Sequence, residues 1–473
     1  MENNNLEIVD QLFNLQLRNK FDQKKTSHSY RKNKLIEFRE ALLNHFSDIE
    51  NALVDDFGKA RVETLTTEIM PLITMINFHV KNLKKWMKPK KVKSSLLFLG
   101  TKNTTVLEGK GNCLVISPWN YPFQLALYPV LTAFAAGNTV ILKPSEFTPK
   151  TNKIISKLIK LVFSDKEVSV IEGEVEVSTK LLDKPFDHIF FTGSTKVGKV
   201  IMEAASKHLA SVSLELGGKS PVLLDSSFDV ETFAKRLVWG KFVNSGQTCV
   251  APDYLIVERN RLDTCLKNLK ISIRDFYGED TFSNPDYAQI INKTNAERLN
   301  ELIEDATSKG ARISLGGNFD NVSRKIEPTI LTDVTLDMKI MKEEIFGPIL
   351  PILTVENKED MLDVLSNFHN PLALYVFSNN KKWIKTIQNN SNSGGYVINE
   401  TLLHVGHPNL PFGGAGKSGI GKYHSHHGFE ELSNIRAVMY RKFEAGLSFF
   451  YPPFNIKIYK TLNFLLKKLN RFL

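Results

Sequence analysis

A single cysteine in a polar, glycine-containing stretch is the first residue whose type and setting could do covalent chemistry. Cys249 ends the stretch Asn244-Ser-Gly-Gln-Thr-Cys249, which follows an apolar segment with helical spacing. Gly246 permits close approach of a substrate, and Gln247 or Asn244 could orient a polar group. A cysteine can act as a nucleophile in such a setting, but lone cysteines more commonly pack in a core. The local sequence leaves both interpretations open.

Two further polar residues lie beside apolar segments. Glu215 precedes a Gly-Gly turn in Leu214-Glu-Leu-Gly-Gly-Lys-Ser-Pro221, at an expected domain boundary. A carboxylate there could act as a general base, and the alternative is a surface salt bridge. Asn120 follows a buried strand in Pro118-Trp-Asn-Tyr-Pro122, at the strand end where α/β folds bind ligands. The alternative for Asn120 is an Asx turn before a helix.

Glycine-rich phosphate loops are present only in incomplete form. No expected strand is followed by G-x-G-x-x-G, so the ordinary dinucleotide fingerprint is missing. Gly193-Ser-Thr-Lys-Val-Gly-Lys199 continues with Val200 where a P-loop needs Ser or Thr, and Gly416-Lys-Ser418 has Pro411 in place of the first Gly. These departures argue against a nucleotide triphosphatase. Gly193 still lies between a strand and a helix, where it could meet a pyrophosphate or only form a tight turn.

The elements that must position these residues follow from the apolar pattern. Residues 6–87 have helical spacing, and residues 94–109 are expected to form a hairpin with its turn at Gly100–Asn103. From residue 112 onward, short apolar runs alternate with helical segments, which predicts an α/β fold with parallel sheets covered on both faces. The expected strands are 112–117, 139–143, 168–171, 188–191, 222–224, 253–257, 349–355, 373–377, 395–399 and 437–443.

Composition narrows the class of protein. The chain has 473 residues, of which 42% are hydrophobic and 24% charged, as in ordinary globular proteins. The net charge is +10. The basic residues are interspersed with acidic ones except in a lysine cluster at 81–93 and in the C-terminal tail. We interpret that cluster as a solvated face and expect no nucleic-acid partner. No apolar run is long enough to span a membrane, and the N-terminus has no secretory signal pattern.

Cysteine and histidine usage supports a reducing compartment without a structural metal. The three cysteines are widely spaced, so neither a disulfide framework nor a four-cysteine zinc site is expected. Cys113 lies in an expected strand and Cys265 in an expected helix, and both are assigned to core packing. A cytoplasmic location follows as an expectation. The histidines fit no common zinc signature and are interpreted as surface or substrate-entrance residues; those considered are His404, His407, His424, His426 and His427.

Taken together, these stretches resemble the aldehyde dehydrogenase superfamily over nearly the whole chain. The setting of Cys249 and the short N-terminus resemble the class 3 branch, which includes fatty aldehyde dehydrogenases. The matching motifs occur in the family's order: Ser117-Pro-Trp-Asn-Tyr-Pro122, Leu142-Lys-Pro-Ser-Glu146, Phe191-Thr-Gly-Ser194, Leu214-Glu-Leu-Gly-Gly-Lys-Ser-Pro221, Gly246-Gln-Thr-Cys249, Glu343-Glu-Ile-Phe-Gly-Pro348 and Leu410-Pro-Phe-Gly-Gly414.

The resemblance implies a role for each matching residue. Cys249 matches the nucleophile, Glu215 the general base and Asn120 the oxyanion-hole amide. Residues matching the cofactor site are Trp119, Lys143, Glu146, Gly193, Ser194, Glu344 and Phe346, and those matching the substrate pocket are Tyr121 and Phe412; no metal is implied. The family's non-standard Rossmann fold accounts for the missing fingerprint.

The resemblance also implies an organisation of the chain into domains. Residues 1–93 with 110–216 match a cofactor-binding domain, and residues 217–402 match a catalytic domain. Residues 94–109 with 403–444 match an arm that pairs with a second copy, and an isolated two-stranded hairpin needs such a partner surface. We therefore expect a homodimer.

The expected reaction is NAD(P)-dependent oxidation of aldehydes, of medium to long aliphatic chain or aromatic, to carboxylates through a cysteine thioester. Acyl transfer to coenzyme A, or reduction of an activated acid, remains as an alternative on the same fold. Retention of Glu215 favours water as the acceptor. A scaffold without activity is disfavoured by intact Cys249, Glu215 and Asn120. Glu146 favours NAD, because a 2′-phosphate beside a carboxylate is repelled, although Lys143 could still allow NADP.

The tail, residues 445–473, ends in a basic amphipathic helix. Ile458, Leu462, Leu465, Leu469 and Phe472 share one helical face, and the segment from Ile456 onward contains five basic residues and no acid. Such a helix could pack on the enzyme or its dimer partner near the substrate entrance, lie on an anionic membrane surface, or stay disordered. Peripheral membrane contact is therefore one of three open interpretations.

Overall fold

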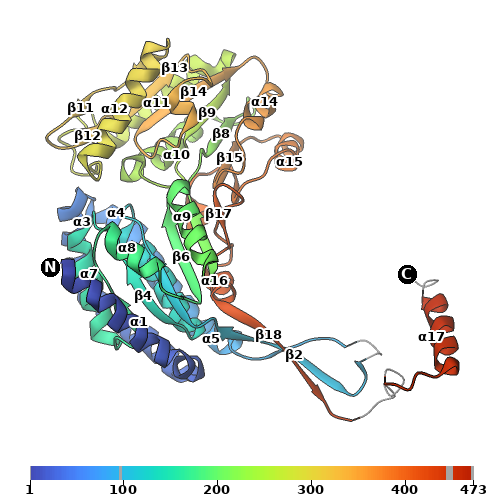
Figure 1. The fold of residues 1–473 in the computed structure, drawn as a ribbon. Coiled ribbons are helices and arrows are strands. Elements are labelled where there is room, and N and C mark those ends of the chain that lie inside the picture. The colour runs from blue at the N-terminus through green and yellow to red at the C-terminus, as the bar shows by residue number, and fades with distance from the viewer. Residues whose placement is uncertain (1, 95–97, 444–450, 470–473) are drawn as a thin grey trace. The chain divides into compact units, whose positions relative to one another are not determined.

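The computed structural model describes residues 2–94, 98–443 and 451–469, and these divide into two compact units. The larger unit comprises the chain through Trp86 together with Gly109–Asn434, and the smaller comprises Met87–Glu108 with Ile435–Leu473. Both large sheets belong to the larger unit (Figure 1). The division into cofactor-binding and catalytic domains stays a prediction.

The first large sheet has six strands in the order β17-β7-β6-β3-β4-β5. All neighbours are parallel except the pair of β17 with β7. Every residue of β3 and β4 is buried, as expected when helices cover both faces of a parallel sheet. The strands are β3 (Asn112–Ile116), β4 (Thr139–Lys143), β5 (Val168–Val170), β6 (His188–Gly193), β7 (Ser211–Leu216) and β17 (Gly419–Ile420).

The helices of this part bury apolar stripes against the first sheet. Val9 and Phe13 of α1 and Ile201 of α9 pack with Leu114 and Ile141 of the strands. A π-helical turn, Leu65–Ile69, lies between α4 and α5. The helices are α1 (Glu2–Lys25), α2 (His28–Asn44), α3 (Phe46–Phe57), α4 (Arg61–Thr64), α5 (Met70–Trp86), α6 (Pro122–Ala136), α7 (Pro149–Val162), α8 (Val175–Leu182), α9 (Thr195–Ser206) and α16 (Ser425–Glu431).

The second large sheet has seven strands in the order β10-β13-β14-β9-β8-β15-β16, parallel except for β10 with β13. Its strands are β8 (Pro221–Leu224), β9 (Tyr254–Glu258), β10 (Arg312–Leu315), β13 (Thr329–Thr332), β14 (Ile349–Val355), β15 (Ala373–Phe377) and β16 (Gly395–Ile398). Its helices are α10 (Val230–Phe242), α11 (Leu262–Tyr277), α12 (Lys293–Ser308), α13 (Lys339–Lys342), α14 (Asp360–Ser366) and α15 (Lys381–Asn389).

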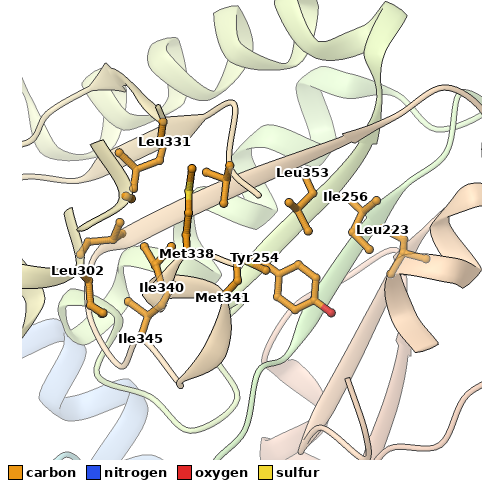
Figure 2. Packing of buried hydrophobic residues seen from close by; sticks show 14 of the residues in the cluster. Leu223, Tyr254, Ile256, Leu302, Leu331, Met338, Ile340, Met341, Ile345 and Leu353 are labelled. Atoms are coloured by element: carbon orange, nitrogen blue, oxygen red, sulfur yellow. The ribbon is translucent and has the colours of Figure 1, made fainter. Parts of the chain in front are cut away.

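A large apolar cluster packs against the second sheet. Figure 2 shows Ile256 and Leu353 of neighbouring strands close to Tyr254, with Leu302 of α12 and Ile340 of α13 in the same cluster. These side chains are almost fully removed from solvent. Burial of one such side chain contributes about 1.5–3 kcal/mol, so the cluster is a main source of stability for the sheet. A short ribbon of β11 (Phe319–Asp320) and β12 (Lys325–Ile326) completes this part.

The predicted α/β class with parallel sheets and a small β arm is confirmed, but one local prediction was wrong and one strand was missed. The turn expected at Gly100–Asn103 does not form, because Thr101 already begins the nine-residue strand β2 (Thr101–Gly109). The arm sheet has the order β1-β2-β18, with β1 (Lys90–Lys91) and β18 (Ser433–Arg441). The first strand of the expected hairpin includes residues 95–97, which lie outside the described residues. Strand β7, which contains Glu215 and ends just before the Gly-Gly pair, was not predicted.

Candidate active site

The backbone that presents Cys249 has an unusual conformation. Asn244, Ser245 and Gly246 all have φ between 52° and 72°, in the left-handed region that residues other than glycine rarely adopt. Asn244 and Ser245 are buried, and the Gln247 side chain donates to the backbone carbonyls of Asn244 and Gln289. Strained residues held this firmly are typical of functional loops. The loop ends in Cys249, whose side chain remains partly accessible.

Cys249 lies where two cavities of different character meet. A cavity of about 330 Å³ is lined on one side by Cys249, Glu215 and Asn120. A second cavity, of about 280 Å³ and mainly apolar lining, also reaches Cys249 and Glu215. The thiol and the carboxylate are therefore accessible from both spaces, which is what a reaction between two different molecules requires.

Three hydrogen bonds hold Asn120 close to the cysteine loop. Its side-chain Nδ2 donates to the Gln247 carbonyl at 2.9 Å. Its own carbonyl accepts from Asn244 Nδ2 at 2.9 Å and from Lys59 Nζ at 3.4 Å. An amide nitrogen carries two hydrogens, so one remains for a substrate oxygen. Asn120 is thus the side chain best placed to donate to an oxyanion formed at Cys249.

Glu215 is buried without hydrogen bonds. Neither carboxylate oxygen has a hydrogen-bond partner within the described part of the chain, although the side chain is only 3% exposed. Burial raises the pKa of Glu215 well above its ordinary value of 4.5; the positive charge of Lys422 opposes this shift and Glu431 adds to it. Buried polar groups without partners are rare and cost free energy. Two orphaned oxygens lining both cavities are suited to bind a water molecule.

The thiol and a second carboxyl are also held in their neutral forms. Burial, followed by the charges of Glu344 and Glu215, raises the pKa of Cys249 to about 12; nearby backbone N–H groups of Cys249 and Val250 oppose the shift. Burial and Asp253 raise the pKa of Glu344 to about 8. The resting thiol is therefore protonated at neutral pH, and a proton must leave it before it can react.

Five of the seven residues matched to the cofactor site line the polar cavity: Trp119, Gly193, Ser194, Glu344 and Phe346. The Trp119 and Phe346 rings lie edge to face at 5.4 Å. Ser194 caps α9, accepting from the Val197 N–H, so the positive end of that helix faces this space. A β-carbon on Gly217 would overlap the Glu344 carboxylate, so the wall is open only because Gly217 has no side chain. These features fit a nicotinamide nucleotide.

The other two matched residues do not line this cavity. Lys143 and Glu146 form an ion pair with Nζ and Oε2 2.8 Å apart, at the carboxyl end of β4. Sequence reasoning missed two residues of α12 that do line the cavity, Asn295 and Arg298. Arg298 donates to the carbonyl of Ile345 at 2.5 Å and so holds the loop that carries Glu344. Asn295 and Arg298 are polar residues of an ordinary amphipathic helix, so nothing in the sequence indicates that they line this cavity.

The apolar cavity contains both residues matched to the substrate pocket, Tyr121 and Phe412. Tyr121 Oη lies 2.7 Å from Thr248 Oγ1, in the residue directly before Cys249. The walls not expected from the sequence come from the π-helical turn, from the start of α5, from α10 and from the segment before Phe412. They include Thr66, Thr67, Pro71, Trp239, Leu402, Leu403 and Val405. Because these elements are far apart in the chain, no local motif could have found them.

One histidine prediction was wrong. His424 is 2% exposed, not a surface residue, and its ring stacks on Phe412 at 5.1 Å with an interplanar angle of 17°. Burial lowers its pKa to about 3. His404 is also largely removed from water, and burial lowers its pKa to about 4. Aromatic packing behind the apolar cavity accounts for both positions, since a neutral imidazole packs well against other rings.

Comparison with known proteins identifies the family of this chain. A profile of the Aldehyde dehydrogenase family matches residues 9–438. The chain belongs to the aldehyde dehydrogenase family. Aldehyde dehydrogenase family 3 member H1 of Arabidopsis thaliana is 41% identical over 93% of this chain and 91% of its own length. The 4,4′-diaponeurosporen-aldehyde dehydrogenase of Staphylococcus aureus is 41% identical over 91% of this chain and 93% of its own length.

A solved structure of the same family has the same fold. The substrate-bound Staphylococcus aureus AldH superimposes with a TM-score of 0.93 at 39% identity, covering 97% of this chain and 99% of its own. The predicted class 3 relationship is confirmed by the family 3 relatives. The protein is an NAD(P)-dependent aldehyde dehydrogenase.

We expect turnover of this dehydrogenase to follow the ionisation of Glu215. A protonated carboxyl cannot accept a proton, so turnover should fall as the pH drops through the raised pKa of Glu215, above its ordinary 4.5. Glu215→Gln should lower steady-state turnover by about 10²–10⁴ and remove this acidic limb, yet still give one burst of reduced cofactor. Lys422, Glu431, Cys249 and Tyr423 also face Glu215 and set the position of the limb.

Steady-state rates over the acidic-to-neutral range, with stopped-flow measurement of the burst, test this expectation. Glu203→Gln, on the exposed side of α9, is the matched control and should leave both the rate and its pH profile unchanged. Full turnover in the Glu215→Gln variant would remove the assignment of Glu215 as base.

Proposed function

We propose that this enzyme converts apolar aldehydes to carboxylates through a thioester on Cys249. The observation that carries the proposal is the junction at Cys249. Cys249 and an unpaired carboxylate line both a polar and an apolar cavity, and an amide donor lines the polar one. Each of these groups suits one step of an aldehyde oxidation that ends in hydrolysis.

The first step is attack by sulfur. Cys249 releases its proton to solvent water, and its thiolate forms a bond to the aldehyde carbon while the carbonyl π electrons move to oxygen. The Asn120 side chain and the Cys249 backbone N–H donate to the resulting oxyanion. Removal of one such donor typically costs about 10²–10³ in rate.

The next steps yield the acid. The residues that line the polar cavity and would hold a nicotinamide nucleotide are Trp119, Gly193, Ser194, Glu344 and Phe346. When bound, that cofactor would supply hydride acceptance, and loss of hydride from the adduct would leave a thioester on Cys249. Glu215 then takes a proton from a water molecule as the water oxygen attacks the thioester carbon. The carbon–sulfur bond breaks, the carboxylic acid leaves and the Cys249 thiolate is released.

Water is favoured over a second thiol as the acceptor of the acyl group. Glu215 is buried with both oxygens unpartnered, a costly arrangement that serves no structural contact in the described residues. Transfer to coenzyme A needs no base for water. An acylating dehydrogenase is therefore the second candidate, and the assay below distinguishes it.

The lining of the apolar cavity points to hydrophobic aldehydes of medium to long chain, or aromatic ones. Trp239, Tyr121 and Phe412 line it together with aliphatic side chains, and Glu215 is its one ionisable carboxyl group among the lining residues. The Staphylococcus aureus relative is named for an aldehyde of diaponeurosporene. Apolar surface removed from water contributes about 25 cal/mol per Å², so longer chains should bind more tightly up to the size of the cavity.

The direct test follows reduced cofactor by absorbance with a panel of aldehydes. We expect oxidation of hexanal, decanal and benzaldehyde, release of free acid, and no rate increase or acyl thioester product on addition of coenzyme A. Cys249→Ala should abolish oxidation while cofactor binding, measured by fluorescence, is retained. Cys265→Ala, a change at a fully buried core cysteine, is the matched control and should keep activity. Activity in the Cys249→Ala variant would contradict the proposal.

The same assay addresses the cofactor. We propose that NAD⁺ is preferred and NADP⁺ usable, because the Glu146 carboxylate would accept from ribose hydroxyls and repel a 2′-phosphate, while its ion-pair partner Lys143 could pair with that phosphate. A kcat/KM for NADP⁺ well above that for NAD⁺ would overturn this preference.

We propose that the arm sheet pairs with a second copy of the chain. β18 is at the edge of the sheet order β1-β2-β18 and is exposed along almost its whole length. It presents Ile435, Met439 and Tyr440, each about 60% exposed (60%, 59% and 63%). An exposed edge with unpaired backbone groups and apolar side chains is a template for strand pairing, which favours a homodimer.

Light scattering of purified protein at micromolar concentration should give the mass of two chains. Met439→Lys with Tyr440→Lys should shift the mass toward one chain, because charged side chains on an edge strand oppose pairing. Val322→Lys, at a site 94% exposed in the β11–β12 turn, is the control. A stable monomer in the unmodified protein would contradict the dimer.

The described part of the C-terminal tail is helical, which confirms that part of the sequence prediction. α17 (Ile456–Leu469) has Lys457, Lys460, Lys467 and Lys468 exposed, together with Ile456, Phe464 and Leu466, each at least 60% exposed. Among the described residues, no helix is long and apolar enough to cross a membrane. We propose that α17 binds the surface of anionic membranes, with the enzyme otherwise in the cytoplasm. Phe472, which was expected on the apolar face of this helix, lies outside the described residues.

Sedimentation with phosphatidylserine-containing vesicles tests the tail. Full-length protein should sediment with these vesicles at low salt, less so at high salt, and a chain truncated after Pro453 should not, since charge attraction is screened by salt. Neutral phosphatidylcholine vesicles are the control. Equally poor binding of both chains would contradict membrane contact, and a changed preference between short and long aldehydes on truncation would favour packing at the substrate entrance instead.

A further inference from the structure

One lysine of the larger unit is completely buried beside the site but belongs to none of the matching motifs. Lys59 is 0% exposed, and its Nζ donates to Glu68 Oε1 at 2.9 Å. Glu63 Oε1 is 3.9 Å away. A lysine is almost never fully buried unless it is paired, and a buried pair is weak as a source of stability. Stability alone therefore does not explain why the Lys59–Glu68 pair is buried at this position.

The pair holds both ends of a short segment, Asn120–Gln124. Lys59 Nζ donates to the Asn120 carbonyl at 3.4 Å, and the second oxygen of Glu68 accepts from the Gln124 N–H at 2.8 Å. The Gln124 N–H is in the first turn of α6, where backbone donors have no partner in the helix and a negative charge is favourable. Between these two contacts the ammonium lies 3.9 Å from the centre of the Tyr121 ring.

The same cluster reaches the loop that carries the thiol. Glu63 Oε2 accepts from the Asn244 N–H at 3.3 Å, and Asn244 Nδ2 donates to the Asn120 carbonyl at 2.9 Å. The Asn120 carbonyl thus receives one donor from the cysteine loop and one from Lys59. Fixing the backbone of Asn120 in this way fixes the direction of its side-chain amide.

Glu68 also belongs to the unusual π-helical turn Leu65–Ile69. Such turns occur often at functional sites. Thr66 and Thr67 of the same turn line the apolar cavity, while Glu68 faces Lys59 in the interior. The turn therefore places a cavity wall and the anchor of Asn120 on one short element.

We propose that Lys59 and Glu68 are positioning residues that hold the Asn120 amide in place to donate to the oxyanion formed at Cys249. This inference rests on the proposed role of Asn120. It assigns the buried pair a task that neither residue performs by touching the substrate. A displacement of about 1 Å at such a donor can cost about 100-fold in rate.

Two thiol reactions separate oxyanion positioning from general damage. With p-nitrophenyl acetate, Cys249 releases its proton to the buffer and the sulfur bonds to the acetyl carbon. An oxyanion forms and p-nitrophenolate then leaves, and no cofactor takes part. In iodoacetamide, the sulfur displaces iodide from a saturated carbon, and no oxyanion forms. Cys113 and Cys265 are fully buried, and Cys249→Ala gives the background of both reactions.

The test variant is Lys59→Met with Glu68→Gln, which removes both charges of the pair, while Glu63 keeps its hydrogen bond from the Asn244 N–H. We expect its acylation rate to fall between about tenfold and about 100-fold while its alkylation rate stays unchanged. The matched control is Lys20→Met, which breaks a partly buried ion pair with Asp187 elsewhere in the same unit and should leave both rates unchanged.

Equal loss of the two rates, or an unchanged acylation rate, would overturn the proposal. A second criterion is the addition of Asn120→Ala: in the double-variant background it should slow acylation by a smaller factor than it does alone, and equal factors would also overturn the proposal. If Asn120→Ala alone leaves the acylation rate unchanged, the proposed role of Asn120 as an oxyanion donor is wrong, and that outcome is distinct from failure of the positioning role. Should the double variant not fold, as judged by circular dichroism, the same rates and criteria apply to Glu68→Gln, which keeps the shape and retains Lys59.

Discussion

The burial of an unpaired carboxylate is the constraint around which this enzyme is organised. Glu215 lies in the buried part of strand β7, with no hydrogen bond to either oxygen in the described chain. Loss of such partners typically costs about 1–3 kcal/mol, so the surrounding fold must supply that free energy elsewhere. Gly413, where a β-carbon would be 2.9 Å from Glu215 Oε1, and Lys422, which donates to the Gly414 carbonyl at 2.8 Å, lie on the segment that covers it.

The two cavities that meet at Cys249 differ in the chemistry of their lining residues. The polar one is lined by the Asn120 amide, a helix N-terminus and carboxyl groups, whereas the apolar one is lined by rings and aliphatic side chains. Cys249 lines both, and it follows a loop in which three consecutive residues, Asn244 to Gly246, are left-handed. Rigid sheets on either side carry the loops, and the strain is confined to a few buried residues that many hydrogen bonds hold in place.

Much of the fold was predictable because parallel strands read as uninterrupted apolar runs. The bounds of Thr139–Lys143, Ile349–Val355 and Ala373–Phe377 were predicted to the residue. Strand β7 was missed because Glu215 interrupts its apolar pattern, and its partner β17 has only two residues. Family motifs brought together the expected reactive residues, whereas Lys59 could not be found, since one lysine among other charged residues gives no signal of burial.

The pairing of β17 with β7 limits where this chain can gain or lose residues. Gly419 is opposite Glu215, and a slip of one residue would turn every side chain of the short strand to the other face. A β-carbon on Gly414 would overlap the Ser418 carbonyl, so the intervening turn has no spare length. An insertion that shifted this register would change the backbone placed opposite Glu215. In contrast, the turn at Val322, which is 94% exposed, could accept added residues or a fused peptide without disturbing the reactive groups.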